Sequence, residues 1–511
     1  MMSQLGFLDV ILSVLPIFIF VFLLMKVKMS SAKASIISLI IAILVGYFYL
    51  NSEIEILFRE CVKGLWNGFT IFTVIFPAIL IYEILLKANL FHAIKVKVEG
   101  IIQDDLLRIL FIGWAFTSFL QSITGFGVPV AVAAPILVSL GVSPIKSVII
   151  CILGHAWGGT FGTLAIAWDS LFLQIPPESI DGNITFYTCL MLWIYNLICG
   201  LTICFIYKKN NIHFKDIAIV FIISAVQGGG QLLFAQQNTS IACFIGSTLS
   251  ILVILIINQL FYVKKNSDKI WNKEIAILHL VFPFAVLTFL IIVFLFIEPV
   301  YLFLNHWKVG IYIPDNIGDT ILYSPISIFT HSGTLLFIAS IISLLFYNFK
   351  GFLQKGDIIN TFYHSLMKSS FVIVPVLFLI MMSKVMDGTG QTIIIANSAA
   401  NLLGTKYPIL SPFIGVLGAF ISSSNMSSNI LFAGFQNHVA ELLNIKSAAI
   451  LAAQTTGGSI GNLMATSNIV LGLTTIGQMG KEGEVLKRMV PIVILSGLFC
   501  GFITYIIGKA V

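Results

Sequence analysis

Long apolar runs, separated by short polar segments, recur from one end of the chain to the other. A helix that crosses a bilayer needs about 20 mostly apolar residues, and most of these runs approach that length. They lie at residues 8–25, 34–50, 64–86, 106–121, 129–141, 146–167, 186–207, 216–234, 241–262, 275–297, 321–348, 370–386, 406–421, 428–443, 446–470 and 489–508. The pattern predicts an all-α polytopic membrane protein with about 12–14 transmembrane helices.

Two of the runs, 129–141 and 428–443, are short and contain small or polar residues. Irregular backbone is tolerated at membrane depth only where protein or a watery cavity satisfies its N–H and C=O groups. We therefore expect these two runs to be arms of re-entrant hairpins and not full membrane spans.

The composition excludes several other classes of protein. Of the 511 residues, 58% are hydrophobic and only 10% are charged, whereas soluble domains carry about 25% charged residues. A soluble enzyme, a secreted disulfide scaffold and a disordered regulator are excluded. The seven cysteines lie mostly inside apolar runs without a Cys-x-x-Cys pair, so we expect buried free thiols and no metal or other cofactor.

Lysine and arginine cluster in alternate connecting segments, and this alternation predicts the orientation of the chain. The base-rich loops are 26–33, 208–215, 264–273, 350–368 and 481–488. We expect these loops in the cytoplasm and the N-terminus outside, with the first run retained as a span because no cleavage site follows it. The net charge of +6 is spread over short loops, so no nucleic-acid partner is expected.

The chain contains a weak internal repeat. A shift of 300 residues places Ile145-Lys146-Ser147 over Ile445-Lys446-Ser447, and one residue of slippage places His155–Gly162 over Gln454–Gly461. Small residues recur in any packed helical protein, so packing alone is one explanation. The shared order of features favours a true internal repeat instead. The predicted topology makes the two copies cross the membrane in opposite directions. We therefore predict two inverted-topology repeats containing re-entrant hairpins and broken helices.

This repeat divides the chain into five predicted parts. They are N-terminal spans at 1–105, a first hairpin and broken helix at 106–170, central spans at 171–405, a second hairpin and broken helix at 406–480, and a C-terminal span at 481–511.

Breaks in the apolar pattern are the candidates for a binding site. The run Ser422–Asn429 has seven polar side chains in eight positions, and glycine-rich breaks occur elsewhere in both copies. Helix N-termini at such breaks can bind a carboxylate through free N–H groups, and none of the three arginines lies mid-span to form a clamp. We expect a small organic anion to contact Gly125, Gly127, Gly158, Gly159, Ser424, Asn425, Ser428, Asn429, Thr456, Gly457 and Gly458.

Two ionisable residues, His155 and Glu83, lie in apolar runs, and the sequence predicts a different role for each. His155 lies at a glycine break, where it is either a hydrogen-bonded packing residue or a substrate contact and proton relay. Glu83 precedes Lys87 by four residues, which predicts an ion pair between them on one helix.

At these same breaks the chain resembles the lactate permease family, bacterial transporters of lactate and glycolate. The resemblance is carried by residues 119–131, 417–432, 453–461 and 480–482. It implies proton-coupled uptake of a 2-hydroxymonocarboxylate across the bacterial inner membrane.

The chain departs from the pattern of that family at four positions. Gln121 replaces a carboxylate, Asn425 replaces an aspartate, Asn462 replaces a lysine and His155 replaces an asparagine. With both carboxylates replaced, His155 is the candidate for proton coupling.

The sequence also bears on three other functions. Oxygen-rich Ser and Asn side chains also suit Na⁺, so a sodium-coupled carrier of another organic anion stays open. An intramembrane enzyme is disfavoured because the chain has no His-Glu-x-x-His or Gly-x-Ser-x-Gly motif. A channel is disfavoured because no charge ring or repeated filter motif is present.

Overall fold

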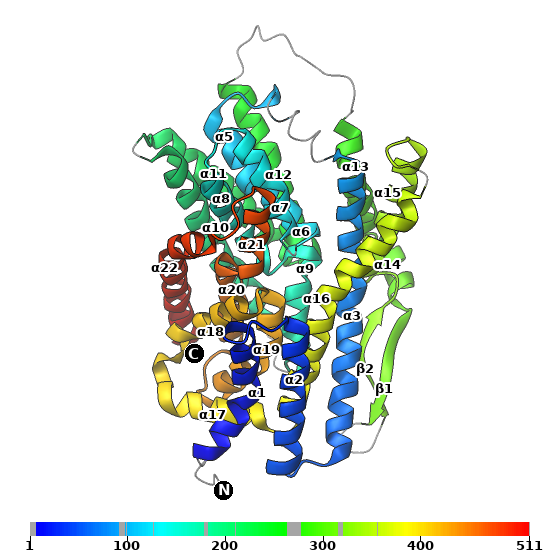
Figure 1. The fold of residues 1–511 in the computed structure, drawn as a ribbon, viewed down its shortest axis with the longest axis vertical. Coiled ribbons are helices and arrows are strands. Elements are labelled where there is room, and N and C mark those ends of the chain that lie inside the picture. The colour runs from blue at the N-terminus through cyan, green and yellow to red at the C-terminus, as the bar shows by residue number, and fades with distance from the viewer. Residues whose placement is uncertain are drawn as a thin grey trace.

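A computed structural model describes residues 7–90, 98, 100–125, 127–177, 182–209, 211–262, 277–314, 320–354 and 356–509. The molecule is an elongated helical bundle with one β-hairpin on its side (Figure 1). Within the described residues, eleven helices are long and apolar enough to cross a membrane, or up to thirteen if each of two bent pairs is one span. The prediction of a polytopic all-α membrane protein is confirmed. The predicted base-rich loop 264–273 lies outside the described residues.

The N-terminal and central elements precede and separate the two repeats along the chain. The N-terminal helices are α1 (Phe7–Met25), α2 (Ser31–Leu44) with a π-helical turn at Val45–Tyr49, and α3 (Ile54–Lys87). The central elements are α10 (Asn183–Lys208), α11 (Phe214–Ala235), α12 (Thr239–Phe261), α13 (Ile277–Ile291), a π-helical turn at Ile292–Phe296, α14 (Glu298–Asn305), β1 (Lys308–Pro314), β2 (Thr320–Ser327), α15 (Ser332–Phe349), α16 (Asp357–Gly388) and α17 (Gln391–Leu403). The C-terminal helix is α22 (Glu482–Lys509).

The two repeats have the same order of elements. The first consists of α5 (Asp105–Leu110), a π-helical turn at Phe111–Phe116, α6 (Thr117–Ile123), α7 (Val128–Ser139), α8 (Pro144–Ala156), a 3₁₀ turn at Trp157–Gly159 and α9 (Gly162–Phe172). The second consists of a 3₁₀ turn at Gly404–Lys406, α18 (Tyr407–Ser422), α19 (Asn425–Leu442), α20 (Ser447–Gly461), a 3₁₀ turn at Asn462–Met464 and α21 (Thr466–Thr475). Each copy is therefore a helical hairpin followed by a helix broken near its middle.

The copies pack against each other reciprocally. The hairpin arm α7 of the first copy contacts α21 of the second, and the hairpin arm α19 of the second contacts α9 of the first. In Figure 1 the first copy starts near the top of the molecule with α5, and the second starts near the bottom after α17. The repeats therefore run in opposite directions, as predicted.

The position of the second helix break differs from the prediction. The glycine-rich segment Thr455–Gly461 was expected to interrupt a helix, but α20 continues through it and ends at Gly461. A Cβ on Gly457 would lie 2.0 Å from the carbonyl oxygen of Pro412 on α18. These glycines are needed for close helix packing, and the break falls one turn later at Asn462–Met464.

Two connecting regions also differ from the prediction. The run 321–348 was expected to be one helix, but its first residues form strand β2, which pairs antiparallel with β1, and α15 begins at Ser332. The segment 387–405, which lies between the predicted runs 370–386 and 406–421, contains helix α17. β2 is rich in β-branched and aromatic residues, so an apolar run of this kind fits a strand as well as a helix.

The longest helices, α3 and α16, pack closely along each other where α3 has a glycine, Gly64. A Cβ on Gly64 would lie 2.6 Å from the Cα of Met381, so only glycine permits this approach. The predicted pair of Glu83 with Lys87 is wrong. Glu83 bonds Lys368 of α16, and Lys87 instead lies 3.7 Å from Asp357. Glu83 therefore links α3 to α16, whereas the sequence suggested an ion pair within α3.

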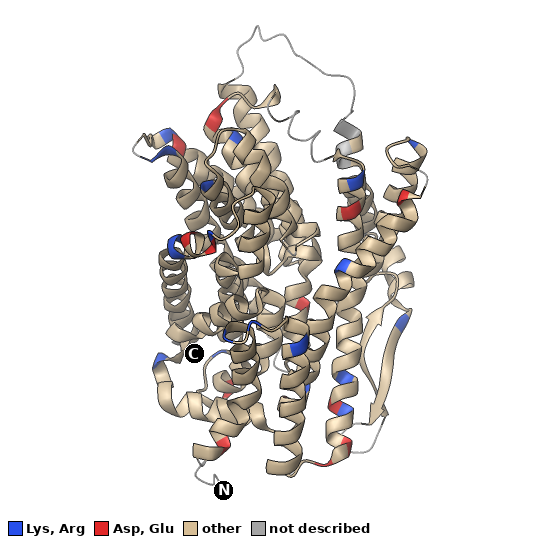
Figure 2. Ribbon diagram, viewed as in Figure 1, with Lys and Arg blue, Asp and Glu red and all other residues tan. Residues whose placement is uncertain are grey.

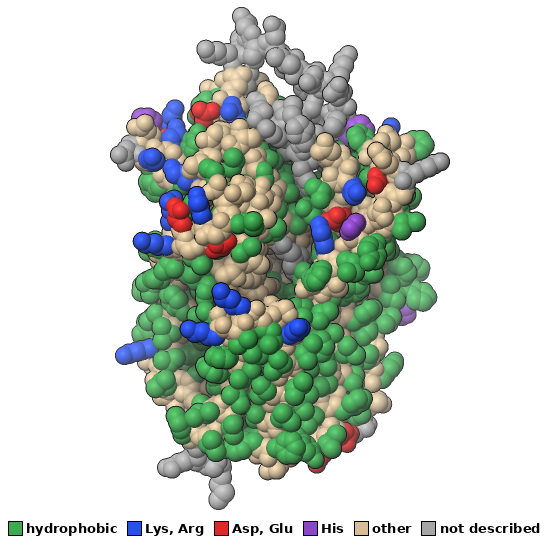
Figure 3. Space-filling model, in the orientation of Figure 1, with side chains coloured by type: hydrophobic (Ala, Val, Ile, Leu, Met, Phe, Trp, Pro, Cys, Tyr) green, Lys and Arg blue, Asp and Glu red, His purple; other side chains and the backbone are tan. Residues whose placement is uncertain are grey.

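The outside of the bundle is strongly apolar. Figure 3 shows a nearly continuous hydrophobic surface over the lower part of this face, with lysine and arginine gathered mainly in the upper half. Large exposed side chains such as Phe58, Phe371 and Phe502 contribute to this surface. Contiguous apolar surface of this extent is typical of contact with lipid. All described cysteines are free, and all but Cys61 are buried, as expected.

Candidate functional site

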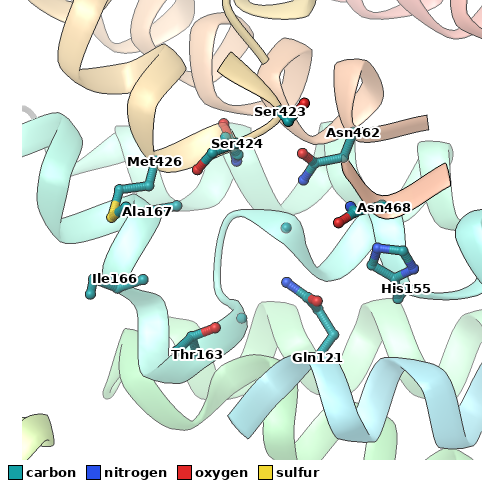
Figure 4. A pocket seen from close by; sticks show the side chains of 13 residues that line it. Gln121, His155, Thr163, Ile166, Ala167, Ser423, Ser424, Met426, Asn462 and Asn468 are labelled. Atoms are coloured by element: carbon teal, nitrogen blue, oxygen red, sulfur yellow. The ribbon is translucent and has the colours of Figure 1, made fainter. Parts of the chain in front are cut away.

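Residues from both hairpins and both broken helices line one pocket between the repeats (Figure 4). The lining residues are Gln121, His155, Gly159, Gly162, Thr163, Ile166, Ala167, Ser423, Ser424, Asn425, Met426, Asn462 and Asn468. The volume of the pocket is about 60 Å³, far below the roughly 300–1,000 Å³ of sites for drug-sized ligands. The pocket suits a ligand of only a few non-hydrogen atoms.

The tip of the second hairpin places a helix N-terminus at this pocket. Ser423 adopts a left-handed conformation with φ of 57°, which turns the chain sharply between α18 and α19. Ser424 then caps α19, because its side chain accepts a hydrogen bond of 3.4 Å from the backbone N–H of Ser427. The first turn of a helix carries partial positive charge and free N–H groups, so this end of α19 favours an anion.

A buried hydrogen-bond network joins the two copies behind the pocket. The Thr160 hydroxyl lies 2.9 Å from the Ser459 hydroxyl and 3.1 Å from the carbonyl oxygen of Thr455. The side-chain amide of Asn425 donates to both Thr160 and Ser459, at 3.2 and 3.1 Å. Asn425 lies on α19, Ser459 lies on α20, and Thr160 lies between the 3₁₀ turn Trp157–Gly159 and α9. The network therefore fixes the hairpin tip against both broken helices.

The first helix break has an irregular backbone. Thr163, Leu164 and Ala165 have φ values of 49°, 51° and 66°, so three consecutive non-glycine residues adopt the left-handed conformation. The Trp168 N–H reaches back to the Thr160 carbonyl oxygen at 3.2 Å and closes the loop. This left-handed turn aims the Thr163 side chain at the pocket (Figure 4).

His155 has one nitrogen fixed and one facing the pocket. Its Nδ1 atom lies 2.8 Å from the carbonyl oxygen of Cys151. A carbonyl oxygen only accepts, so Nδ1 carries the proton and Nε2 of the neutral ring has a free lone pair. The side chain is 1% exposed, and in Figure 4 the ring lies beside Asn468, with the Gln121 amide nearby.

The described lining residues include no lysine, arginine, aspartate or glutamate. The polar groups are the amides of Gln121, Asn425, Asn462 and Asn468, together with hydroxyl groups and the His155 ring. Amides both donate and accept hydrogen bonds. The pocket can therefore hold a small polar anion by hydrogen bonds and helix dipoles without an ion pair.

The structure brings some of the predicted site residues to the pocket and leaves others away from it. Gly159, Ser424, Asn425 and His155 line the pocket. The other predicted residues do not line it: Gly125, Gly127, Gly158, Ser428, Asn429, Thr456, Gly457 and Gly458.

Contacts with neighbouring elements account for four of these residues. The Ser428 hydroxyl donates to the Gly415 carbonyl oxygen at 2.8 Å, and the Asn429 amide donates to the Ala167 carbonyl oxygen at 2.7 Å. A Cβ on Gly458 would lie 1.8 Å from Oδ1 of Asn425, so glycine allows the hairpin to approach α20. At Gly127, with φ of 82°, a Cβ would lie 2.8 Å from Leu471. These residues position the walls of the pocket.

Five polar lining residues are not among the predicted contacts. Thr163, Ser423 and Asn468 each lie at, or within a few residues of, a hairpin tip or a helix break. Gln121 and Asn462 had been noted only as departures from a family pattern. Their positions in the sequence could have indicated them, because a polar side chain next to a helix break or hairpin tip can face the space that the break opens.

Comparison with known proteins identifies the family of this chain. The family model described as L-lactate permease matches residues 9–510. The chain belongs to the L-lactate permease family. It is therefore a membrane transporter and not an enzyme.

The relatives cover nearly the whole chain. The L-lactate permease of Escherichia coli strain K12 is 24% identical over 96% of this chain and 94% of its own length. The glycolate permease GlcA of the same strain is 25% identical over 98% and 96%. Among solved structures, the Alcanivorax borkumensis YdaH transporter aligns over 97% of both chains with 14% identity and a TM-score of 0.47.

Proposed function

We propose that this member of the L-lactate permease family imports a lactate- or glycolate-type 2-hydroxymonocarboxylate across the bacterial cytoplasmic membrane, in symport with protons. The supporting observation is the small pocket that both inverted copies share at the N-terminus of α19. In inverted-repeat transporters the substrate binds between discontinuous helices of the two halves. The names of the relatives point to the same class of substrate.

The pocket chemistry suits one carboxylate and one hydroxyl group. The carboxylate binds at the first turn of α19, where Ser424 and Asn425 line the pocket. The hydroxyl group pairs with the amides of Gln121 and Asn462, which both donate and accept. A second carboxylate would enter a site whose described lining has no cation, and burying an unpaired charge is unfavourable. The proposal therefore includes selection against dicarboxylates.

His155 is the proposed carrier of the proton. Its Nδ1–H is held by the Cys151 carbonyl oxygen, so only Nε2 is available to take a proton from the pocket. A protonated ring beside the bound carboxylate stabilises the anion, and release of the anion favours release of the proton. Coupling then requires no carboxylate in the protein site.

Alternating access follows from movement of the two copies around this pocket. The two copies are held together near their helix breaks by the hydrogen-bond network of Thr160, Asn425 and Ser459. Because both hairpin tips end near the pocket, rocking one copy against the other opens it to one side and closes it to the other.

The coupling proposal is tested by uptake of radiolabelled L-lactate into proteoliposomes with an imposed pH gradient or sodium gradient. The pH gradient, acid outside, is expected to drive accumulation at least tenfold above the sodium arm. His155→Gln is expected to lose pH-driven accumulation while retaining lactate exchange, because glutamine keeps a polar side chain but cannot carry the proton.

His364→Gln is the matched control, since His364 is exposed on α16 and lies away from the pocket. It should transport like the unmodified protein. Sodium-driven uptake that is insensitive to pH would contradict proton coupling. Undiminished pH-driven uptake in His155→Gln would exclude His155 as the carrier.

A further inference from the structure

A second cavity, of about 380 Å³, lies between the first turns of α3, the last turns of α16 and strand β2. Its lining residues are Ile56, Arg59, Glu60, Lys63, Tyr323, Lys384, Asp387 and Gly388. It shares no lining residue with the central pocket. Figure 2 shows residues of both signs on the lower part of α3, beside the β-hairpin.

Positive charge exceeds negative charge in this cavity. Arg59, Lys63 and Lys384 face two carboxylates, and both carboxylates already have partners. Glu60 accepts a bond of 2.7 Å from Nζ of Lys63 and lies 3.4 Å from Nε of Arg59. Asp387 lies 3.4 Å from Nε2 of His438.

Lys384 is the buried member of this set. The residue is 9% exposed, and its ammonium group donates to the carbonyl oxygen of Leu173 just beyond the end of α9. Among the described ion pairs, none joins Lys384 to a carboxylate. The Asp387 and Glu60 carboxylates attract this ammonium from beyond ion-pair distance, and an anion in direct contact with it would stabilise it further.

The Tyr323 hydroxyl supplies a neutral donor at the same place. It accepts a bond of 3.1 Å from the side-chain amide of Asn67, which leaves its own proton free to donate. A cation excess, a buried ammonium and a free hydroxyl donor around one open space are the features of a site for a small anion.

We propose that this cavity is a capture site for the carboxylate of the transported monocarboxylate, separate from the central pocket. The inference rests on the proposed function for the nature of the anion. The alternation of base-rich loops places this end of α3 and α16 on the outer side, where an imported anion arrives. Helix α9 links the sites, because Ala167 lines the central pocket and Leu173 accepts from Lys384. Six residues of helix separate them, or about 9 Å.

Equilibrium binding of radiolabelled L-lactate to the purified protein tests this site independently of transport. Two lactate equivalents per chain are expected. In Lys63→Gln the dissociation constant of one equivalent should rise about fivefold, because one cation is removed. Glu60→Gln should change it in the opposite direction, because it removes a negative charge from the same cavity. A purely structural cluster would not give opposite effects.

Lys208→Gln is the matched control, because Lys208 has a similar side-chain exposure, 24% against 21% for Lys63, and also pairs with a carboxylate. It should bind like the unmodified protein. If only one equivalent of lactate binds and neither cavity variant changes its dissociation constant, the capture site is overturned. The proposal of a substrate site in the central pocket would be unaffected. A second equivalent displaced by chloride as readily as by glycolate would overturn its assignment to carboxylates. No lactate binding at all would overturn the proposed function as well.

Discussion

At the scale of single residues, the left-handed turn Thr163–Ala165 is the least regular part of the central pocket. A left-handed conformation costs an L-residue about 1–2 kcal/mol, and here three occur in succession. Such conformations persist when surrounding contacts hold them, and they concentrate at functional sites. A Cβ on Gly125 would lie 2.2 Å from the Thr163 hydroxyl, which shows how tightly the hairpin tip encloses the turn.

A glycine substitution tests whether the turn is strained. Ala165→Gly removes a buried methyl group but also relieves the left-handed alanine, so we expect a change in unfolding free energy within about 1 kcal/mol of zero. Ala452→Gly removes an equally buried methyl group from the regular helix α20 and should destabilise by roughly 1–2 kcal/mol. Unfolding of the two variants in detergent provides the comparison. Equal destabilisation of both would contradict a strained turn.

The sequence could predict some residues of the site because they interrupt apolar runs. Ser424 and Asn425 stand out in a polar cluster, and His155 stands out as an ionisable residue. Lys384 was not recognised, because a lysine near the end of an apolar run usually extends to the membrane interface. Only the structure shows that it is buried, with its ammonium group bonded to the Leu173 carbonyl oxygen just beyond the end of α9.

At the scale of elements, hairpins and broken helices build the site, and glycine has two different roles in them. Gly158 and Gly159 lie in the 3₁₀ turn that breaks the first helix, whereas Gly457 and Gly458 lie inside regular α20. The sequence pattern is the same in both copies. It cannot distinguish a glycine that breaks a helix from one that admits a neighbouring backbone, because the neighbour is far away in the chain. The order of elements was predictable, and the exact position of the second break was not.

The stability of the start of helix α15 should depend on pH. His331 caps this helix, with Nδ1 accepting from the Gly333 N–H at 3.3 Å, and burial lowers its pKa to about 4. The unfolded chain binds this proton near pH 6.5, so the cap stabilises fully above pH 6.5 and its contribution is lost as the pH falls towards 4. The loss should amount to roughly 2–3 kcal/mol.

Thermal unfolding in detergent at pH 7 and pH 4.5 measures this effect. His331→Asn keeps a capping side chain that does not titrate, so its unfolding temperature should fall less over this interval than that of the unmodified protein. His364→Asn, at an exposed position, should retain the full decrease. The same decrease in His331→Asn as in the unmodified protein would contradict the role of His331.

At the scale of the whole molecule, the reciprocal packing of the copies explains why the site lies where it does. The contacts of α7 with α21 and of α19 with α9 bring both hairpin tips and both helix breaks to one region. The charged residues lie mainly away from this region, and the pocket itself is lined by neutral polar groups. We propose that a transporter built this way binds its anion with helix ends and amides, and that it selects against dicarboxylates because the described lining residues include no lysine or arginine.

The central claim is most directly tested by a proteoliposome uptake panel of L-lactate, glycolate, pyruvate and dicarboxylates, with counterflow measured for each. Saturable, counterflow-active transport of L-lactate or glycolate is expected, with dicarboxylates transported at least tenfold less efficiently because the pocket would leave a second charge unpaired. Absence of transport of every monocarboxylate by folded, reconstituted protein would contradict the account. Flux that neither saturates nor shows counterflow would also contradict it, because such flux indicates a channel.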